Sequence, residues 1–332
     1  MWRRAAYRLG RQMLWLLKGR REAERPSIPS TLGLPPETGE AARTVAAVNA
    51  VRSQLVVGEY SSLAPLLRDC QADAKAVLLH DLFSMRSKAF IDAGLPPDHA
   101  SPSFEEEAAR LADVDLCIHA SATEAAALEE RLPNCRHIWL PPKISANIPD
   151  PAPSMKAKVV FIGVKHGGNF DALDAILNEI WPEVHKARPE AELWIVGEIA
   201  EMIQTAPPGV ILKHRLESLL DLAGPDTIGF APTRVMSGIS IKLATYLELG
   251  CCIVCHSKTL DAYGGRLDDL VSHAETEQDV VALLIRLLDD PDLRKDKAGR
   301  AARLARERLN NCDLVAYLET IGSGQASVQS GD

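Results

Sequence analysis

The sequence lacks the features of several common classes of protein. None of its apolar runs approaches the ~20 residues that a membrane-crossing helix needs, and the run "MLWLL" is too short for the core of a signal peptide. The formal net charge of -8 argues against a general nucleic-acid binder. The 7 cysteines are odd in number and scattered along the chain, so they do not indicate a disulfide framework. We therefore expect a cytoplasmic protein with no nucleic-acid partner.

Three of the cysteines cluster in the run "CCIVCH". Cys252 and Cys255 have the Cys-x-x-Cys spacing of some metal and redox sites. Such pairs normally lie on a loop or a helix start, whereas this run is apolar and predicts a buried strand. Because free cysteine behaves as a small buried hydrophobe, the run predicts core packing and no metal site.

Apolar strands alternate with amphipathic helices from about residue 43 onward. The length of 332 residues suggests about two domains, and 46% hydrophobic residues are enough for a core. The first half offers the strands "QLVVG", "KAVLLHD", "DLCIHA" and "RHIWLPP"; the second offers "KVVFIG", "AELWIVG", "GVILKH", "TIGFAPT" and "CCIVCH". This pattern indicates parallel sheets covered on both faces. It predicts an α/β fold with two Rossmann-like domains, whose ligands bind at the carboxyl ends of the strands.

Stretches rich in proline and polar residues mark the expected domain boundaries. Residues 1–42 form a basic amphipathic helix and a linker, and residues 43–141 form the first domain. The run "PPKISANIPDPAPSMKA" places a second linker at 142–156. The second domain then covers 157–322, and the polar tail 323–332 has a composition typical of disorder.

The first eighteen residues separate charge from apolar surface. On a helical wheel, Trp2, Leu9 and Leu16 share one side. The other side carries the cations Arg3, Arg4, Arg8, Arg11 and Lys18. A basic amphipathic helix can lie in an anionic membrane surface. The alternative, which stays open, is a helix that packs on the first domain with solvated arginines.

The stretch "RVMSGISIKLATYLELG" follows the carboxyl end of the strand "TIGFAPT". It predicts a loop and then a helix from about Ile239 to Gly250. Lys242 falls in the first turn, where the positive end of the helix dipole disfavours a cation. The same turn contains no carboxylate to offset it. An anionic ligand nearby would account for this arrangement.

The backbone of the same stretch suits an anion. Gly238 lets the chain approach a ligand closely, and the free amides of Ile239 and Ser240 would face that ligand at the helix start. Arg234 adds a full positive charge. A phosphate or diphosphate is the natural occupant, and the alternative is a helix capped by Ser237 with no ligand.

Longer segments of the second half carry a resemblance to a known family. In order, they are "VVFIGVKHGGNFDAL", "EIWPEVHKARPEAELWIVG", "HRLESLLDL" and "FAPTRVMSGISIKLATYLELGCCIVCHSKTLDAYG". Over residues 157–310 the chain resembles the nucleotide-sugar domain of the group 1 glycosyltransferases, a retaining family with the GT-B fold. In the first half, "LLHDLFSMRSKAF" and "EEEAARLADVDLCIHASATEAAALEERLPN" resemble the acceptor domain of that family.

The resemblance implies roles for residues at the strand ends. The donor diphosphate would be bound by Arg234, Ser237, Gly238, Ile239, Ser240 and Lys242. The loop near the donor sugar or phosphate would supply Gly163, Lys165, His166 and Asn169. The ribose and base would meet Thr245, His214 and Arg215. On the acceptor side, His80 and Asp81 would be catalytic, and Arg86 would meet an anionic acceptor; the alternative is that His80 only caps a strand.

The sequence departs from the family at two points. The family commonly places two glutamates eight positions apart around the phosphate-binding helix, and the matching residues here are Ser237 and Thr245. A hydroxyl at Thr245 is a weaker ribose acceptor than a carboxylate, and Glu248 lies one turn too far along to replace it. The first domain is also short, because the opening strands of the family and their Gly-rich loop have no match.

The expected function is that of a hexosyltransferase-like glycosyltransferase. It would move a sugar, with retention, from a nucleotide-diphosphate sugar to a glycan or lipid-linked acceptor, in surface polysaccharide or glycolipid synthesis. No metal and no cofactor besides the donor are expected. The alternative is a catalytically silent GT-B protein that acts as partner or scaffold of another transferase; an epimerising or phosphate-releasing relative of the fold is a third option.

Overall fold

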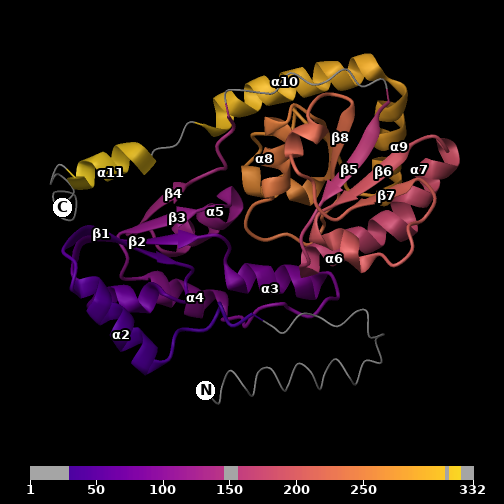
Figure 1. Cartoon of the computed structure of the whole chain (residues 1–332). Coiled ribbons are helices and arrows are strands. Elements are labelled where there is room, and N and C mark those ends of the chain that lie inside the picture. The colour runs from indigo at the N-terminus through magenta and orange to yellow at the C-terminus, as the bar shows by residue number, and fades with distance from the viewer. Residues whose placement is uncertain (1–29, 146–155, 311–313, 323–332) are drawn as a thin grey trace, which may run out of the picture. The chain divides into compact units, whose positions relative to one another are not determined.

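Figure 1 shows the computed structural model, which describes residues 30–145, 156–310 and 314–322. The described chain divides into two compact units. The first unit draws on Met1–Pro141, Ser237–Ile239 and Cys312–Asp332, and the second on Pro142–Met236 and Ser240–Asn311. Each unit is built on its own parallel sheet. The α/β fold class predicted from the sequence is confirmed.

The first unit contains the four strands that the sequence predicts. They are β1 (Ser53–Glu59), β2 (Ala72–Leu79), β3 (Leu116–His119) and β4 (Arg136–Trp139). They lie in the order β1-β2-β3-β4, and every neighbouring pair is parallel. Because both faces of the sheet are covered, the strands are almost continuously apolar rather than alternating.

Helices of the first unit cover both faces of this sheet. One face packs on α2 (Thr38–Asn49), the 3₁₀ helix η2 (Ala64–Asp69), α4 (Phe104–Leu111) and α5 (Ala122–Arg131). The helix α3 (Phe83–Asp92) follows β2. Ser103 is the N-cap of α4, since its hydroxyl accepts a hydrogen bond from the amide of Glu106.

The last helix lies outside the second domain, although the sequence predicted that this domain extends to residue 322. The helix α11 (Leu314–Gly322) belongs to the first unit, where Leu314 and Tyr317 pack on the face formed by Ala76, Leu116, Ile118 and Ile138. The guanidinium of Arg136 lies 4.6 Å from the centre of the Tyr317 ring. This helix is not among the predicted elements, and its apolar pattern does not say which sheet it covers.

The second unit has a six-stranded parallel sheet in the order β10-β9-β8-β5-β6-β7. Its strands are β5 (Lys158–Ile162), β6 (Glu192–Val196), β7 (Val210–Lys213), β8 (Thr227–Ala231), β9 (Cys252–His256) and β10 (Ser272–Ala274). The first five are predicted strands. The sequence gives no signal for β10, because three residues are too few to show a period.

Helices and 3₁₀ turns connect the strands of the second unit. The segment after β5 runs as α6 (Gly167–Ala175), one π-helical turn (Ile176–Ile180) and α7 (Trp181–Ala187). The connections after β6 and β7 contain the 3₁₀ turns η4 (Glu198–Met202) and η5 (Leu219–Leu222). The remaining helices are α8 (Ile241–Glu248), α9 (Glu277–Asp289) and α10 (Pro291–Leu309). "CCIVCH" is a buried strand, as predicted.

Some predictions fall on parts of the chain that the structure does not describe. The amphipathic helix over 1–18, most of the linker over 142–156 and the tail over 323–332 lie outside the described residues. Within the described residues, no helix is both long and apolar enough to span a bilayer.

Candidate functional site

Two neighbouring loops of the second unit bring most of the predicted donor-binding residues together. Strands β5 and β8 are adjacent and parallel, so their carboxyl ends lie at the same edge of the sheet. The loop after β5 carries Gly163 and leads into α6 with Asn169; the loop after β8 leads into α8 with Lys242. This edge is where an open parallel sheet binds its ligands.

Lys242 is the centre of this arrangement. Its ammonium nitrogen donates to the amide oxygen of Asn169 at 2.5 Å and lies 5.4 Å from the centre of the Phe161 ring. Asn169 is buried, and its amide nitrogen donates to the carbonyl of Val164 at 2.9 Å, which fixes its orientation. Burial lowers the pKa of Lys242 to about 8. The residue as a whole is half-buried.

Arg234 occupies a different electrostatic environment. Its Nε donates to Asp171 at 2.9 Å and its Nη1 donates to Glu277 at 2.9 Å. Two carboxylates therefore compensate this guanidinium. The prediction that Arg234 offers a full positive charge to a diphosphate is corrected accordingly.

The start of α8 also differs from the prediction. The helix begins at Ile241 and its N-cap is Ser240, whose side chain makes no capping hydrogen bond. Ser237 lies three residues earlier, so it does not cap the helix. Within the second unit, the carbonyl of Ser240 accepts a hydrogen bond from the buried hydroxyl of Tyr263 at 2.7 Å, which anchors the helix start.

The predicted ribose and base residues lie along the second unit. The hydroxyl of Thr245 donates to the carbonyl of Ile241 at 3.1 Å, so it can only accept a further hydrogen bond. Glu248 accepts a hydrogen bond from the amide of Ser145 at 3.1 Å. His214 and Arg215 are exposed after the edge strand β7.

The remaining residues of the donor loop have structural partners. His166 is the N-cap of α6, and its Nδ1 accepts from the amide of Gly168 at 3.1 Å. Lys165 forms an ion pair with Glu201. At Gly163, an added Cβ would lie 3.1 Å from the side chain of Ile199, so a larger residue would fit only tightly there.

The first unit gathers the predicted acceptor-side residues at the end of β2. His80 is exposed there, and its ring centre lies 4.9 Å from that of Tyr60. Tyr60 has a φ of 62°, a strained value for a residue other than glycine. Sequence reasoning missed Tyr60, because backbone strain leaves no signal in a single sequence.

Arg86 forms the core of an ion-pair network in this unit. It donates to Asp81 at 2.9 Å and, through two nitrogens, to Asp98 at 2.8 and 2.5 Å. The hydroxyl of Ser237, a residue that belongs to this unit, donates to Asp81 at 3.2 Å. Because two carboxylates compensate Arg86, its predicted role of meeting an anionic acceptor is not supported by its charge balance.

Two buried glutamates, also missed from the sequence, bind backbone amides in the first unit. Glu107 accepts from the amides of Phe83 and Ser84 at 3.0 and 2.9 Å, at the start of α3. Glu124 accepts from the amide of Gly238 at 2.7 Å, and burial raises its pKa to about 8.

The amide of Gly238, predicted to approach a diphosphate, is therefore occupied by a carboxylate of the protein itself. The backbone there has a φ of 61°, and an added Cβ would lie 2.3 Å from the carbonyl of His80. Glycine is thus required at this position by the first unit rather than by a ligand.

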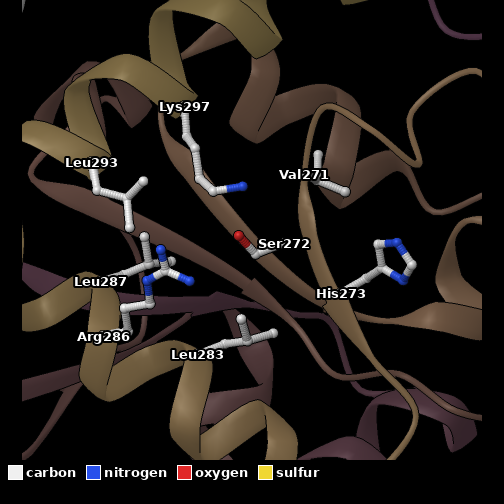
Figure 2. A pocket seen from close by; sticks show the side chains of 8 residues that line it. All are labelled: Val271, Ser272, His273, Leu283, Arg286, Leu287, Leu293 and Lys297. Atoms are coloured by element: carbon white, nitrogen blue, oxygen red, sulfur yellow. The ribbon is translucent and has the colours of Figure 1, made fainter.

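A shallow pocket of about 240 Å³ lies elsewhere in the second unit (Figure 2). It is lined by Val271, Ser272, His273, Leu283, Arg286, Leu287, Leu293 and Lys297. These residues lie at the amino end of β10 and on α9 and α10, and none of them is a predicted site residue. Since parallel sheets bind ligands at the carboxyl ends, we place the candidate site at Lys242 rather than in this pocket.

Comparison with known proteins identifies the fold. No protein-family model and no curated protein sequence matches the chain. Solved structures do match: a trehalose-6-phosphate protein from E. coli bound with UDP-2-fluoro glucose has a TM-score of 0.59 at 12% identity, over 87% of this chain and 78% of that one. A sucrose-phosphate synthase from Thermosynechococcus elongatus has a TM-score of 0.61 at 14% identity, over 88% and 77%.

A third similar structure is a UDP-forming α,α-trehalose-phosphate synthase from Burkholderia xenovorans in complex with glucose-6-phosphate. It has a TM-score of 0.57 at 12% identity, over 87% of this chain and 78% of that one. At such low identities the likeness shows the fold alone. The chain has the GT-B fold with two Rossmann-like units, as its sequence predicts.

Proposed function

We propose that the protein is a glycosyltransferase that uses a nucleotide-diphosphate sugar as donor and transfers the sugar with retention. The observation that carries this proposal is Lys242. Its ammonium is held by a neutral amide, that of Asn169, at the carboxyl edge of the second sheet. A desolvated cation with a neutral partner gains most from an anionic ligand. The similar structure bound with UDP-2-fluoro glucose supports a donor of this class.

Lys242 would act on the leaving group. Negative charge grows on the diphosphate as the bond between sugar and phosphate breaks, and a fixed cation placed there stabilises that charge. The dipole of α8, which begins one residue before Lys242, acts in the same direction. Because this charge comes from the protein, the proposed transfer needs no metal ion and no cofactor besides the donor.

The acceptor in this proposal is a glycan or a lipid-linked sugar in surface polysaccharide or glycolipid synthesis. The support is the basic amphipathic pattern of residues 1–18, which would bring the enzyme to the cytoplasmic face of an anionic membrane. His80 and Asp81 keep their proposed catalytic roles on the acceptor side. The third similar structure holds glucose-6-phosphate, so a soluble sugar phosphate is the competing acceptor class.

A second candidate function is that of a silent partner or scaffold. Two observations favour it: the guanidinium of Arg234 is compensated by Asp171 and Glu277, and the amide of Gly238 donates to Glu124. The residues at the two glutamate positions of the family, Ser237 and Thr245, remove further donor contacts. Such a protein would keep the fold and lose turnover.

Calorimetry with UDP, GDP and ADP, followed by release of the nucleotide diphosphate from the matching sugar nucleotides, tests the proposal on the full chain. Binding of one of them together with release of that diphosphate in the presence of acceptor is expected. Binding without release favours the scaffold. Absence of binding for all three would remove the donor assignment.

The membrane part of the proposal is tested separately by sedimentation with anionic and neutral vesicles. The full chain should bind anionic vesicles at low salt, and deletion of residues 1–18 should abolish this binding while the body stays folded. If the deletion unfolds the protein, or the intact chain ignores anionic vesicles, the membrane anchor is wrong.

A further inference from the structure

Two short repeats of the same kind lie side by side in the first sheet. The sequence reads Cys-x-His at Cys117 and His119 on β3, and again at Cys135 and His137 at the start of β4. Strands β3 and β4 are parallel neighbours, and Cys117 pairs with His137 in their register. Since side chains two residues apart share a face of a strand, all four side chains lie on the same face of the sheet.

Three of the four side chains form a close group, and the fourth, Cys135, contacts Cys117. The sulfurs of Cys117 and Cys135 are 3.5 Å apart, and Nε2 of His119 lies 2.9 Å from Nδ1 of His137. One ligand atom from each of Cys117, His119 and His137 lies within 4.8 Å of the others. Ligands of a tetrahedral zinc ion lie about 2.0 to 2.3 Å from it and hence about 3 to 4 Å from one another. The three-residue group is close to that geometry, whereas Cys135 lies outside it and would supply the fourth ligand only after a rotation of its side chain.

The hydrogen bonds prepare two of these groups for a metal. Nε2 of His137 lies 3.1 Å from the carbonyl of Leu132, which can only accept, so this nitrogen carries the proton. Nδ1 of His137 is then a lone pair that faces the cluster. A backbone carbonyl that orients a histidine in this way is typical of a metal ligand.

A buried ring nitrogen of His119 is a second observation that favours a metal ion here. Its side chain is completely buried, and among the described residues its Nδ1 has no hydrogen-bond partner. Because Nδ1 of His137 accepts the hydrogen bond from Nε2 of His119, the lone pair of the His119 ring is on Nδ1. A buried unpaired nitrogen is costly unless something binds there.

We propose that Cys117, Cys135, His119 and His137 bind one zinc ion in a closed tetrahedral site. Zinc favours two thiolates with two imidazoles in structural sites. Binding releases the two thiol protons, so the ion and the two thiolates sum to zero charge and can be buried. Cys135 and His137 are less buried than the other two and offer the ion a way in.

The role of this ion would be structural. It would clamp β4, an edge strand of only four residues, onto β3 in the smaller of the two sheets. The site does not depend on the proposed transfer reaction. It does revise the expectation from the sequence that the chain contains no metal site.

Two alternatives to zinc binding, simple packing and disulfide formation, would give different experimental results. If the four side chains only pack together, the two sulfurs stay as thiols and the two rings share a hydrogen bond. If the sulfurs oxidise, Cys117 and Cys135 form a disulfide with the loss of two hydrogens. Either outcome is measurable on the same preparation.

The experiment uses the full chain without an affinity tag, kept reduced. Elemental analysis is expected to find about one zinc per chain. Replacement by Co²⁺ should give the intense visible bands of a tetrahedral site and a thiolate-to-cobalt charge-transfer band. X-ray absorption should find two sulfur and two nitrogen neighbours at about 2.3 and 2.0–2.1 Å.

Cys135→Ser and His137→Gln are the test variants, and Cys255→Ser is the matched control. Cys255 is a buried free thiol on β9 of the other unit, and it belongs to no such cluster. Both test variants should lower zinc affinity at least tenfold and weaken the cobalt charge-transfer band, and the control should change neither. If the test variants do not fold, the cobalt spectrum and the X-ray absorption data of the unaltered chain still test whether the zinc site exists.

Three results would overturn the proposal. They are a reduced chain that binds no stoichiometric zinc or cobalt, cobalt spectra without a thiolate band, and equal zinc affinity in the test variants and the control. A Cys117–Cys135 disulfide in the chain isolated under anaerobic, reducing conditions would also overturn it.

Discussion

Lys242 and Arg86 are both cations set near the carboxyl end of a strand, one in each unit, and their surroundings are opposite. Lys242 has a neutral amide and an aromatic ring beside its ammonium. Arg86 has carboxylates of Asp81 and Asp98 at hydrogen-bond distance. The first arrangement leaves an unbalanced charge available to a ligand, whereas the second is balanced within the protein. Both residues are cations that follow a strand, so the neighbouring groups decide which of them can bind an anionic ligand.

Arg86→Leu should destabilise the first unit. The three charged side chains are only 11%, 12% and 15% exposed, so removal of the guanidinium leaves two almost buried carboxylates without their arginine, with Ser237 and His99 as remaining hydrogen-bond partners. The free energy of unfolding should fall by about 3–5 kcal/mol, measured by denaturant titration. Lys88→Ala is the control, because its ion pair with Asp92 is largely exposed and should contribute close to nothing. An equal loss for both variants would contradict the network.

His80→Ala should lower turnover without changing the affinity for the donor. His80 is exposed at the end of β2, in the unit that does not hold Lys242. Turnover should fall about a hundredfold, the effect expected when a positioning contact to a reactant is lost. The dissociation constant for the donor, measured by calorimetry, should stay the same. Lost donor affinity with normal turnover per bound donor would refute the acceptor-side role.

Lys242→Ala should give the converse result. Binding of a nucleotide diphosphate should weaken by about 1–3 kcal/mol, the range for hydrogen bonds to a charged group and for loss of a buried partner. Lys295→Ala, an exposed lysine on α10, serves as the matched control and should bind normally. Arg234→Ala should weaken this binding less than Lys242→Ala does, because two carboxylates already compensate the charge of Arg234. A larger loss of affinity for Arg234→Ala would make Arg234 the main ligand of the diphosphate.

The pH dependence of donor binding should report the same lysine. The pKa of Lys242 in the free protein is about 8, and a bound diphosphate favours the charged form and raises it. Affinity is therefore full below pH 8 and declines above it, by up to about tenfold per pH unit until the pKa of the complex is reached. Calorimetry at several pH values should show this decline in the unaltered chain and lose it in Lys242→Ala.

Thr245→Glu should produce the smallest change, a gain. The hydroxyl of Thr245 can only accept, and a carboxylate at this half-buried position is a stronger acceptor for a ribose hydroxyl. Nucleotide diphosphate affinity should rise by about 0.5–1.5 kcal/mol. A deoxyribose analogue should show no gain, and a gain of equal size for both would argue against a ribose contact at this residue.

Most of the fold could be predicted because long apolar strands and amphipathic helices have clear periods. The four strands of the first unit and five of the second follow directly from such runs. The strand β10 was not predicted because it has three residues. The place of α11 was not predicted because periodicity defines an apolar face without naming the surface that the face covers.

The candidate site was predictable only in part. The glycine-containing loop and Lys242 follow from a strand-to-helix pattern, and the structure sets Lys242 beside Asn169. The pairing of Arg234 with Asp171 and Glu277 joins positions far apart in the chain, and no local pattern shows such pairs. The contact between Cys117 and Cys135 was not predictable either, because only the pairing of β3 with β4 brings these two residues together.

The helix α11 has a consequence for the order in which the protein is made. It packs on the face of the first sheet formed by β2, β3 and β4, yet it is encoded after the whole second unit. On the ribosome, Ala76, Leu116, Ile118 and Ile138 emerge early and must wait for residues 314–322 to cover them. The second unit, by contrast, is contiguous except for three residues and can close as soon as α10 has emerged. The unit that is synthesised first is therefore completed last.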